Sequence, residues 1–133
     1  MEKLLILDAN SIVNRAFYAV RLLTTKEGAH TNAIFGFLNI LFKYMDEIRP
    51  DYIAAAFDLP QPTFRHEMYD GYKATRHKMP DELAEQIPVL KEVLSAMNIK
   101  IYEKPGFEAD DVIGTAARVC TEENVCCCVL TGD

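Results

Sequence analysis

The chain has 133 residues, of which half are hydrophobic and 26% are charged, so it can bury the core of one domain of ordinary size. No stretch of about 18 apolar residues is present and the amino terminus lacks the pattern of a secretion signal, which excludes a membrane span and favours the cytoplasm. The net charge of −6, taken alone, argues against a nucleic-acid partner, because phosphate binding requires Lys and Arg.

Short apolar runs and amphipathic stretches alternate from the amino terminus onward. Lys3–Asp8 is an apolar run that ends on an acid, and it predicts a buried strand. Two helices are expected next, over Ser11–Leu23 and over Thr31–Ile48; Thr31 is the expected N-cap of the second, and Pro50 ends it. One face of that second helix is expected to carry Ile34, Phe37, Leu38, Leu41, Phe42 and Met45.

The second half of the chain repeats this alternation after an irregular stretch. Tyr52–Phe57 predicts another buried strand, followed by Asp58, whereas residues 59–80 lack a clean period and predict a long connection with some helix. Asp81–Met97 predicts a helix that is capped by Asp81 and kinked at Pro88. The last expected elements are a strand over Ile99–Tyr102, a helix over Glu108–Glu123 and a strand over Val125–Thr131.

The order of these elements indicates the fold class. Strands this apolar are covered on both faces, and helical crossovers imply that the strands are parallel. The sequence therefore predicts an α/β fold with an open, mainly parallel sheet flanked by helices. In such sheets, ligands bind outside the carboxyl ends of the strands.

Acidic residues cluster at those expected strand ends and at one helix start. A single acid at a strand end is usually a cap or turn residue, and acids at a helix start are often explained by the helix dipole. Carboxylates from four separate segments that converge would instead repel one another unless cations are bound, and Mg²⁺ prefers such oxygen ligands. We therefore interpret the following acids as candidate metal ligands: Asp8, Asp58, Glu108, Asp110, Asp111 and Asp133.

The four cysteines do not suggest a metal site. Cys126, Cys127 and Cys128 are consecutive, and neighbours on a strand point to opposite faces, which excludes a tetrahedral zinc site. The spacing of these three and Cys120 also does not suggest a disulfide framework. We expect all four to be small buried hydrophobic side chains in a reducing compartment.

The stretch from Arg65 to Lys78 is basic and contains tyrosines. Cations contact phosphates and aromatic rings stack on unpaired bases, so this composition suits a nucleic-acid strand, although a solvated loop would look similar. If the six candidate acids are set aside, 14 of the 20 acids remain against 14 Lys and Arg, and the rest of the chain is neutral. The net charge is then compatible with a nucleic-acid partner.

Several motifs resemble those of the 5′ nuclease family, which includes the amino-terminal exonuclease domain of bacterial DNA polymerase I, phage 5′ exonucleases and flap endonucleases. Gly106-Phe107-Glu108-Ala109-Asp110-Asp111-Val112 is similar to the family's G-[YF]-E-A-D-D signature. The family's opening segment resembles Leu7-Asp8 with Arg15-Ala16-Phe17-Tyr18-Ala19, and its next acidic motif resembles Thr131-Gly132-Asp133. Its second block resembles Phe57-Asp58, Phe64-Arg65-His66-Glu67 and Gly71-Tyr72-Lys73-Ala74 with Arg76.

This resemblance, closest to the polymerase I branch, implies a sheet-based nuclease core like those of PIN domains and resolvases. It implies two divalent ions, Mg²⁺ or Mn²⁺, and cleavage of DNA 5′ flaps and 5′ ends and of RNA primers in replication and repair, without a small-molecule cofactor. By position, Lys73 and Arg76 are similar to the family's catalytic basic residues, and the expected nucleic-acid contacts are Arg15, Arg65, Tyr72, Lys73 and Arg76. The six candidate acids match its metal ligands.

Family members continue with a further acid and a helical DNA-binding region, so the resemblance implies that residues 1–133 are a catalytic core truncated at its carboxyl end. Little activity is then expected from the chain alone. Two alternatives stay open at this point. One is a PIN-type ribonuclease, which has a similar acidic site but lacks the Phe64–Arg76 block, and the other is a truncated metal-binding domain without catalysis.

Overall fold

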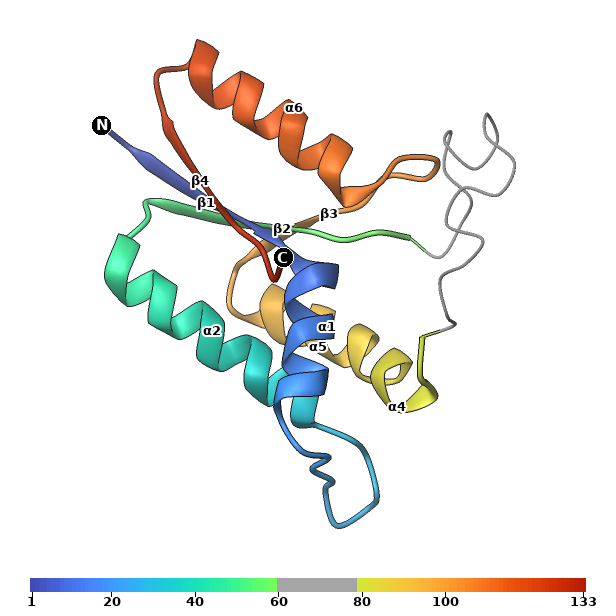
Figure 1. Cartoon of the computed structure of the whole chain (residues 1–133). Helices are drawn as coiled ribbons and strands as arrows, with labels where there is room; N and C mark the ends of the chain where they lie inside the picture. Colours follow the sequence, from blue (N-terminus) through green and yellow to red (C-terminus); the bar gives the residue numbers. More distant parts are fainter. Residues whose placement is uncertain (60–78) are drawn as a thin grey trace.

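The computed structural model describes residues 1–59 and 79–133. Within these residues the strands form a parallel four-stranded sheet of order β3-β2-β1-β4 (Figure 1). The strands are β1 (Lys3–Asp8), β2 (Tyr52–Ala56), β3 (Lys100–Tyr102) and β4 (Cys126–Leu130). The open parallel sheet expected from the sequence is therefore confirmed.

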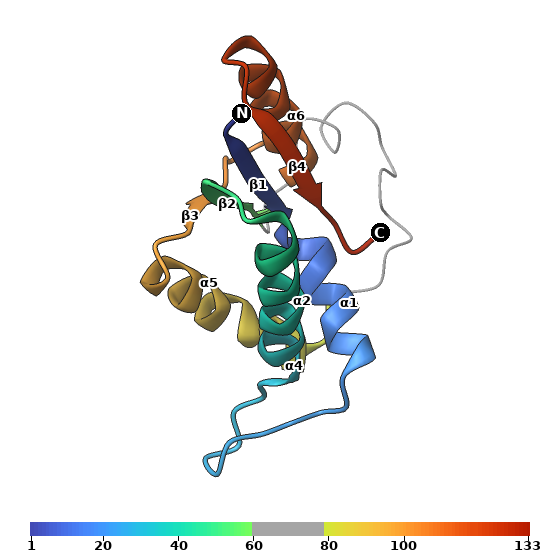
Figure 2. The same cartoon turned by 90° about the vertical axis from the view of Figure 1, so that its left-hand side faces the viewer.

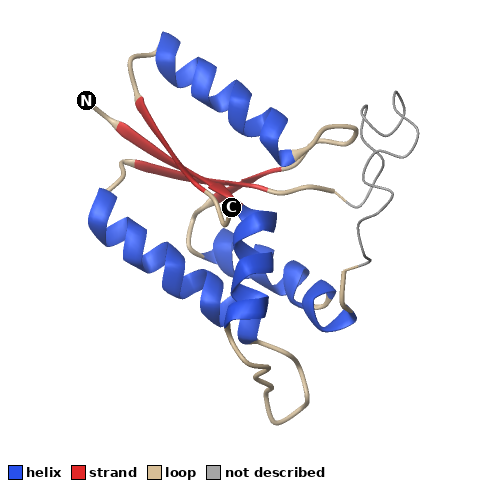
Figure 3. Cartoon of the chain, viewed as in Figure 1, coloured by secondary structure: helices blue, strands red, loops and turns tan. Residues whose placement is uncertain are grey.

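Helices cover the two faces of the sheet unequally (Figures 2 and 3). On one face lie α1 (Ala9–Ala19), α2 (Asn32–Ile48), the short α4 (Asp81–Ala84) and α5 (Gln86–Ala96), and on the other lies α6 (Ala109–Glu122). Among the described residues, no helix is long and apolar enough to cross a membrane.

The alternation of side chains along β1 explains the two faces, because successive residues of a strand point in opposite directions. Leu5 and Leu7 are fully buried and join the main core, where they pack with residues such as Phe37 and Leu90 of the multi-helix face. Leu4 and Ile6 point toward α6 and line a groove between that helix and the sheet. The α6 face is less completely covered than the other.

Close packing between α1 and α2 depends on Gly36. A Cβ at this position would lie only 2.8 Å from the Cβ of Ala16, so a larger residue would push the two helices apart. The start of α2 is fixed by a buried glutamine of α5: the Gln86 side-chain oxygen accepts from the backbone N–H of Ala33 at 2.8 Å and of Ile34 at 3.2 Å. These bonds satisfy donors that a helix start leaves unpaired.

That role was expected of Thr31. Thr31 does occupy the N-cap position of α2, but its side chain makes no capping hydrogen bond, and its hydroxyl donates to the backbone oxygen of Leu23 at 3.4 Å. Helix α1 also differs from expectation, because it begins at Ala9 rather than at Ser11 and ends at Ala19 rather than at Leu23. Its end is set by Val20, which adopts an extended backbone that leads the chain away from the helix.

The single helix expected over Asp81–Met97 is two helices, with the break at Glu85 rather than a kink at Pro88. Pro88 cannot donate to the carbonyl of Ala84, and its ring crowds that carbonyl, so the interruption falls in the turn before the proline. Asp81 is not the cap either, because Pro80 occupies the N-cap position and Asp81 lies in the first turn.

Two burial expectations were wrong. Phe42, placed on the buried face of α2, is 50% exposed. Of the cysteines only Cys120 is buried, while the three on β4 are partly exposed because β4 is an edge strand. All four thiols are free, and burial, together with the neighbouring Cys120 thiol, raises the pKa of Cys127 to about 11, so this thiol stays protonated at neutral pH.

Candidate metal and nuclease site

The strand order places a crevice beside Asp8. The chain proceeds from β1 to β2 and β3 in one direction and then returns to place β4 on the other side of β1. Ligands of open parallel sheets bind where the order reverses in this way, outside the carboxyl ends of the strands. Asp8 is the last residue of β1, and Thr131, Gly132 and Asp133 directly follow β4, so both sides of this point carry polar residues.

A cavity of about 830 Å³ lies there and is lined by acids from separate segments. Its wall also contains polar residues of the first turns of α1, namely Asn10, Ser11, Asn14 and Arg15. The acids that line it are Asp8, Asp58, Glu108, Asp110 and Asp133. The cavity thus brings together five of the six carboxylates that the sequence singled out.

Asp8, the last residue of β1, is only 9% exposed. Its Oδ2 accepts a hydrogen bond from the Thr131 hydroxyl at 3.1 Å. Burial raises the pKa of Asp8 above its usual value, the Ser11 and Thr131 hydroxyls partly offset this, and repulsion from Asp110 and Asp133 adds to the increase. An ionised Asp8 is therefore disfavoured here unless a cation compensates its charge.

The start of α6 holds three more acids through backbone hydrogen bonds. Glu108 is the N-cap residue and is 7% exposed, and its backbone N–H donates to Oδ2 of Asp111 at 2.9 Å. Asp58, which follows β2, accepts from the N–H of Ala109 at 2.5 Å. Asp58 and Asp111 therefore cap α6, which is the structural role that isolated acids at a helix start often have.

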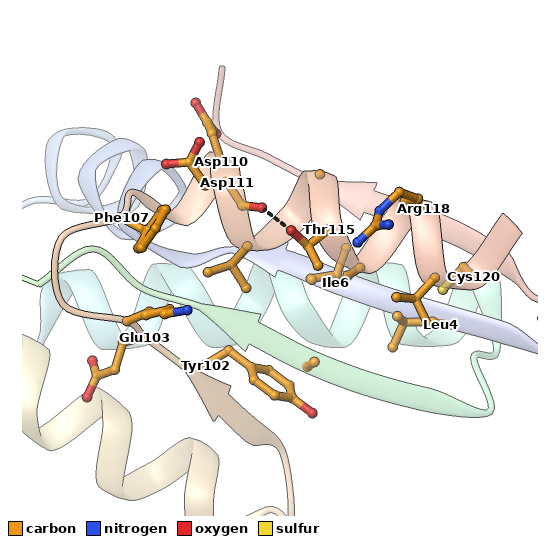
Figure 4. Close-up of a pocket in the computed structure, with 16 residues that line it drawn as sticks. Leu4, Ile6, Tyr102, Glu103, Phe107, Asp110, Asp111, Thr115, Arg118 and Cys120 are labelled. Atoms are coloured by element: carbon orange, nitrogen blue, oxygen red, sulfur yellow. Dashed lines mark hydrogen bonds between the residues drawn. The ribbon is translucent and has the colours of Figure 1, made fainter. Parts of the chain in front are cut away.

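Asp111 is the sixth predicted ligand and does not line this cavity. Together with Asp110 it lies at one end of a second, larger cavity of about 1020 Å³, between α6 and the sheet (Figure 4). That groove is lined mainly by apolar residues such as Leu4, Ile6 and Tyr102, and three acids line it, against five in the cavity beside Asp8. We therefore assign the candidate chemistry to the smaller cavity.

Four polar residues of the site were not named from the sequence. Asn10 Oδ1 accepts from the Asp58 N–H at 2.8 Å, and the Ser11 hydroxyl accepts from the Gly132 N–H at 2.9 Å. Lys91 lines the same cavity, pairs with Glu103 at 2.7 Å and lies 5.0 Å from the Phe57 ring centroid. Thr131 is the fourth. Their proximity to the acids depends on the folded chain, and only Thr131 belongs to a recognisable motif.

The basic residues predicted to handle nucleic acid can be placed only in part. Arg15 is exposed on α1, lines the acidic cavity and donates to the backbone oxygen of Gly132 at 3.5 Å. The others, Arg65, Tyr72, Lys73 and Arg76, lie outside the described residues.

The donor set fits a hard divalent cation in its chemistry, because it consists of carboxylate oxygens. As the side chains stand, however, no three His, Cys, Asp or Glu side chains in residues 1–59 and 79–133 are close enough together to hold an ion. A carboxylate has two oxygens, so accepting a cap through one does not prevent contacts through the other.

Comparison with known proteins identifies the family. Residues 3–133 match the family described as 5′-3′ exonuclease, N-terminal resolvase-like domain. The chain belongs to this 5′-3′ exonuclease family. DNA polymerase I of Caldicellulosiruptor bescii is 47% identical over 131 residues, which are 98% of this chain and 15% of that protein. The 5′-3′ exonuclease of Aquifex aeolicus is 48% identical over 118 residues, which are 89% of this chain and 41% of that protein.

The fold of this exonuclease-family chain is also similar to a solved structure of a phage enzyme. A bacteriophage T5 flap endonuclease, in a pseudo-enzyme–product complex with DNA and metal ions, superposes with a TM-score of 0.62 at 18% identity, covering 92% of this chain and 46% of that one. The resolvase-like core is thus confirmed. The family match also favours the 5′ nuclease interpretation over the PIN-type ribonuclease.

Proposed function

We propose that residues 1–133 form the catalytic core of a divalent-metal-dependent 5′ nuclease, which hydrolyses phosphodiesters at 5′ ends and 5′ flaps of DNA and removes RNA primers in replication and repair. The observation that carries this proposal is the single cavity lined by Asp8, Asp58, Glu108, Asp110 and Asp133 where the strand order reverses. The family match and the names of the relatives support it.

Mg²⁺ or Mn²⁺ is the ion we expect, with two ions in the complete enzyme. The residues that would hold them are the five acids that line the cavity, namely Asp8, Asp58, Glu108, Asp110 and Asp133. Asp111 lies outside this cavity, and the family motif suggests it as a sixth. Such ions, when bound, lower the pKa of a water and neutralise charge on the leaving oxygen. The chain's own contribution is to hold carboxylates on rigid strand and helix ends, with Asp8 buried and hydrogen-bonded so that it stays oriented toward the cavity.

The cationic residues would serve the nucleic-acid strand. Arg15 lines the acidic cavity, where its guanidinium can contact a phosphate beside the acids. Lys73 and Arg76 are proposed to act at the scissile phosphate, and Arg65 and Tyr72 to contact the 5′ strand. A lysine that stabilises charge developing in the transition state affects the cleavage rate more than binding.

The test is cleavage of labelled 5′-flap DNA by the purified chain in Mg²⁺ and then in Mn²⁺, with Asp8→Asn as the control. We expect slow cleavage that the control lacks, well below the rate of the A. aeolicus exonuclease, because the chain aligns with 41% of that protein. Equal cleavage by the Asp8→Asn variant would contradict the proposed site. Cleavage of single-stranded RNA in preference to flap DNA would instead support the PIN-type alternative.

A further inference from the structure

Two hydroxyl groups join three chain segments directly beside Asp8. The Ser11 hydroxyl, in the first turn of α1, lies 3.0 Å from the backbone oxygen of Asp8 and 3.0 Å from the Thr131 hydroxyl. It also accepts from the Gly132 N–H at 2.9 Å. Thr131 in turn lies 3.1 Å from Asp8 Oδ2, so the end of β1, the start of α1 and the end of β4 share one hydrogen-bond network.

The direction of the Thr131 bond follows from the groups involved. The Thr131 hydroxyl donates its one hydrogen to Asp8 Oδ2, and the ionised carboxylate that would bind a cation can only accept. The Thr131 oxygen remains an acceptor, and the N–H of Asp133 lies 3.3 Å from it. Thr131 thereby contacts one candidate ligand through its proton and the backbone of another through its oxygen.

Thr131 is exposed and lies beyond the last residue of β4, outside the buried core. Within the described part of the chain, its hydroxyl donates to Asp8, accepts from the Asp133 N–H and lies 3.0 Å from the Ser11 hydroxyl. The position of Gly132 reinforces the arrangement, because a Cβ there would lie 2.4 Å from the backbone oxygen of Ser11. The segment after β4 is therefore closely fitted against α1.

We propose that Thr131, supported by Ser11, is a positioning residue of the proposed metal site, which fixes the Asp8 carboxylate in the orientation that lines the cavity. This inference rests on the proposed function. A carboxylate that is already oriented loses less conformational freedom when it binds an ion, and groups that orient metal ligands in this way typically change metal affinity by roughly 10- to 100-fold. No motif of acids alone reveals this role.

The test measures Mn²⁺ binding to the whole chain by electron paramagnetic resonance or calorimetry, together with the thermal midpoint of the metal-free chain. Thr131→Val, which keeps the side-chain shape and removes the hydroxyl, should weaken Mn²⁺ binding by roughly 10- to 100-fold. Thr131→Ser should retain binding close to that of the unchanged chain. Thr121→Val is the matched control, since that threonine bonds to the Ala117 carbonyl within α6, away from the site.

A merely structural role predicts a different pattern, in which Thr131→Val lowers the metal-free midpoint and leaves Mn²⁺ affinity unchanged. Equal Mn²⁺ affinity in Thr131→Val and in the unchanged chain would overturn the inference while leaving the proposed function intact. A folded, unchanged chain that binds no Mn²⁺ would overturn both. If Thr131→Val fails to fold, Ser11→Ala is the variant to measure, because it removes the hydroxyl that supports Thr131. It should weaken Mn²⁺ binding, and an unchanged affinity would refute the positioning role.

Discussion

The two sides of the acidic cavity hold their carboxylates by different means. At the start of α6, Asp58 and Asp111 accept hydrogen bonds from backbone N–H groups and cap the helix. On the other side, Asp8 occupies the N-cap position of α1 but makes no capping bond, and its carboxylate is engaged by the hydroxyl of Thr131.

Asp58 and Asp111 would serve the fold even without a bound ion, whereas Asp8 would not. Capping stabilises a helix start whether or not an ion is present, so Asp58 and Asp111 have a structural role that is independent of function. Asp8 is buried beside other acids and gains no such role, and burial raises its pKa, which is a cost to the metal-free fold. Asp8 is therefore the residue whose presence most requires a functional explanation.

Replacing Asp8 with Asn should produce the largest effect and sharpen this contrast. Mn²⁺ affinity should fall by about 100-fold or more, beyond the effect of residues that only orient a ligand. The metal-free variant should nevertheless be more stable than the unchanged chain at neutral pH. An acid whose pKa is raised by folding contributes stability below its unfolded value, near 3.8, and that contribution is lost as the pH rises through the folded value.

Asn cannot ionise, so the stability advantage of the variant should vanish on acidification below about pH 3.8, the usual value for the side chain. Urea unfolding of both chains between neutral and acidic pH, without metal, measures this directly. A variant that is less stable at neutral pH would show that the ionised Asp8 carboxylate contributes to the fold after all.

Gly132→Ala should have the next largest effect, because the added Cβ would meet backbone atoms of Ser11 at 2.4 and 2.8 Å. Overpacking of this kind typically costs about 1–3 kcal/mol, and it should also displace Thr131 from Asp8. Gly114→Ala is the matched control in α6, where a Cβ would meet nothing within 4 Å and should stabilise the helix by roughly 0.5–1 kcal/mol. Unfolding free energies that are equal for the two variants would contradict the steric argument.

The smallest expected change in stability comes from replacing the acids at the start of α6. Asp111→Ala removes the acceptor for the Glu108 N–H and should cost about 1 kcal/mol of unfolding free energy. Asp110→Ala, the same change one residue earlier, should cost less, because it also relieves repulsion with Asp8. If chemical denaturation instead ranks Asp110→Ala as the more damaging change, the assignment of Asp111 as the cap is wrong.

The sequence predicted the strands well and the helix ends less well. Lys3–Asp8 was predicted with its correct bounds because a buried parallel strand is a short apolar run with few alternatives. The cap of α2 could not be predicted, since Gln86 reaches it from another helix, more than 50 residues away in sequence. The sequence predicted a kink at Pro88, but the break lies at Glu85, because a proline disturbs the carbonyl four residues before it.

Within the candidate site, acids were easier to find than their partners. Acids at strand ends follow from the parallel sheet, which gathers those ends at one edge, and five of the six line one cavity. Ser11 and Thr131 carry ordinary hydroxyls whose importance arises only when residues from opposite ends of the chain meet. The sequence did not show that Asp111 caps α6 while Asp110 lines the cavity, because packing at the start of α6 sets the direction of each side chain.

The pairing of β1 with β4 also has a consequence for how the molecule is made. It joins Lys3–Leu7 to Cys126–Leu130, whereas the pairing of β1 with β2 joins Leu4–Asp8 to Tyr52–Ala56, which are much nearer in the sequence. Contacts between distant residues form slowly, and on the ribosome the β4 residues emerge after those of the other three strands. Asp8 therefore leaves the ribosome long before its partner Thr131, and the acidic cavity can be assembled only after β4 has been synthesised. A nascent chain would therefore carry Asp8 well before the residues that face it across the cavity.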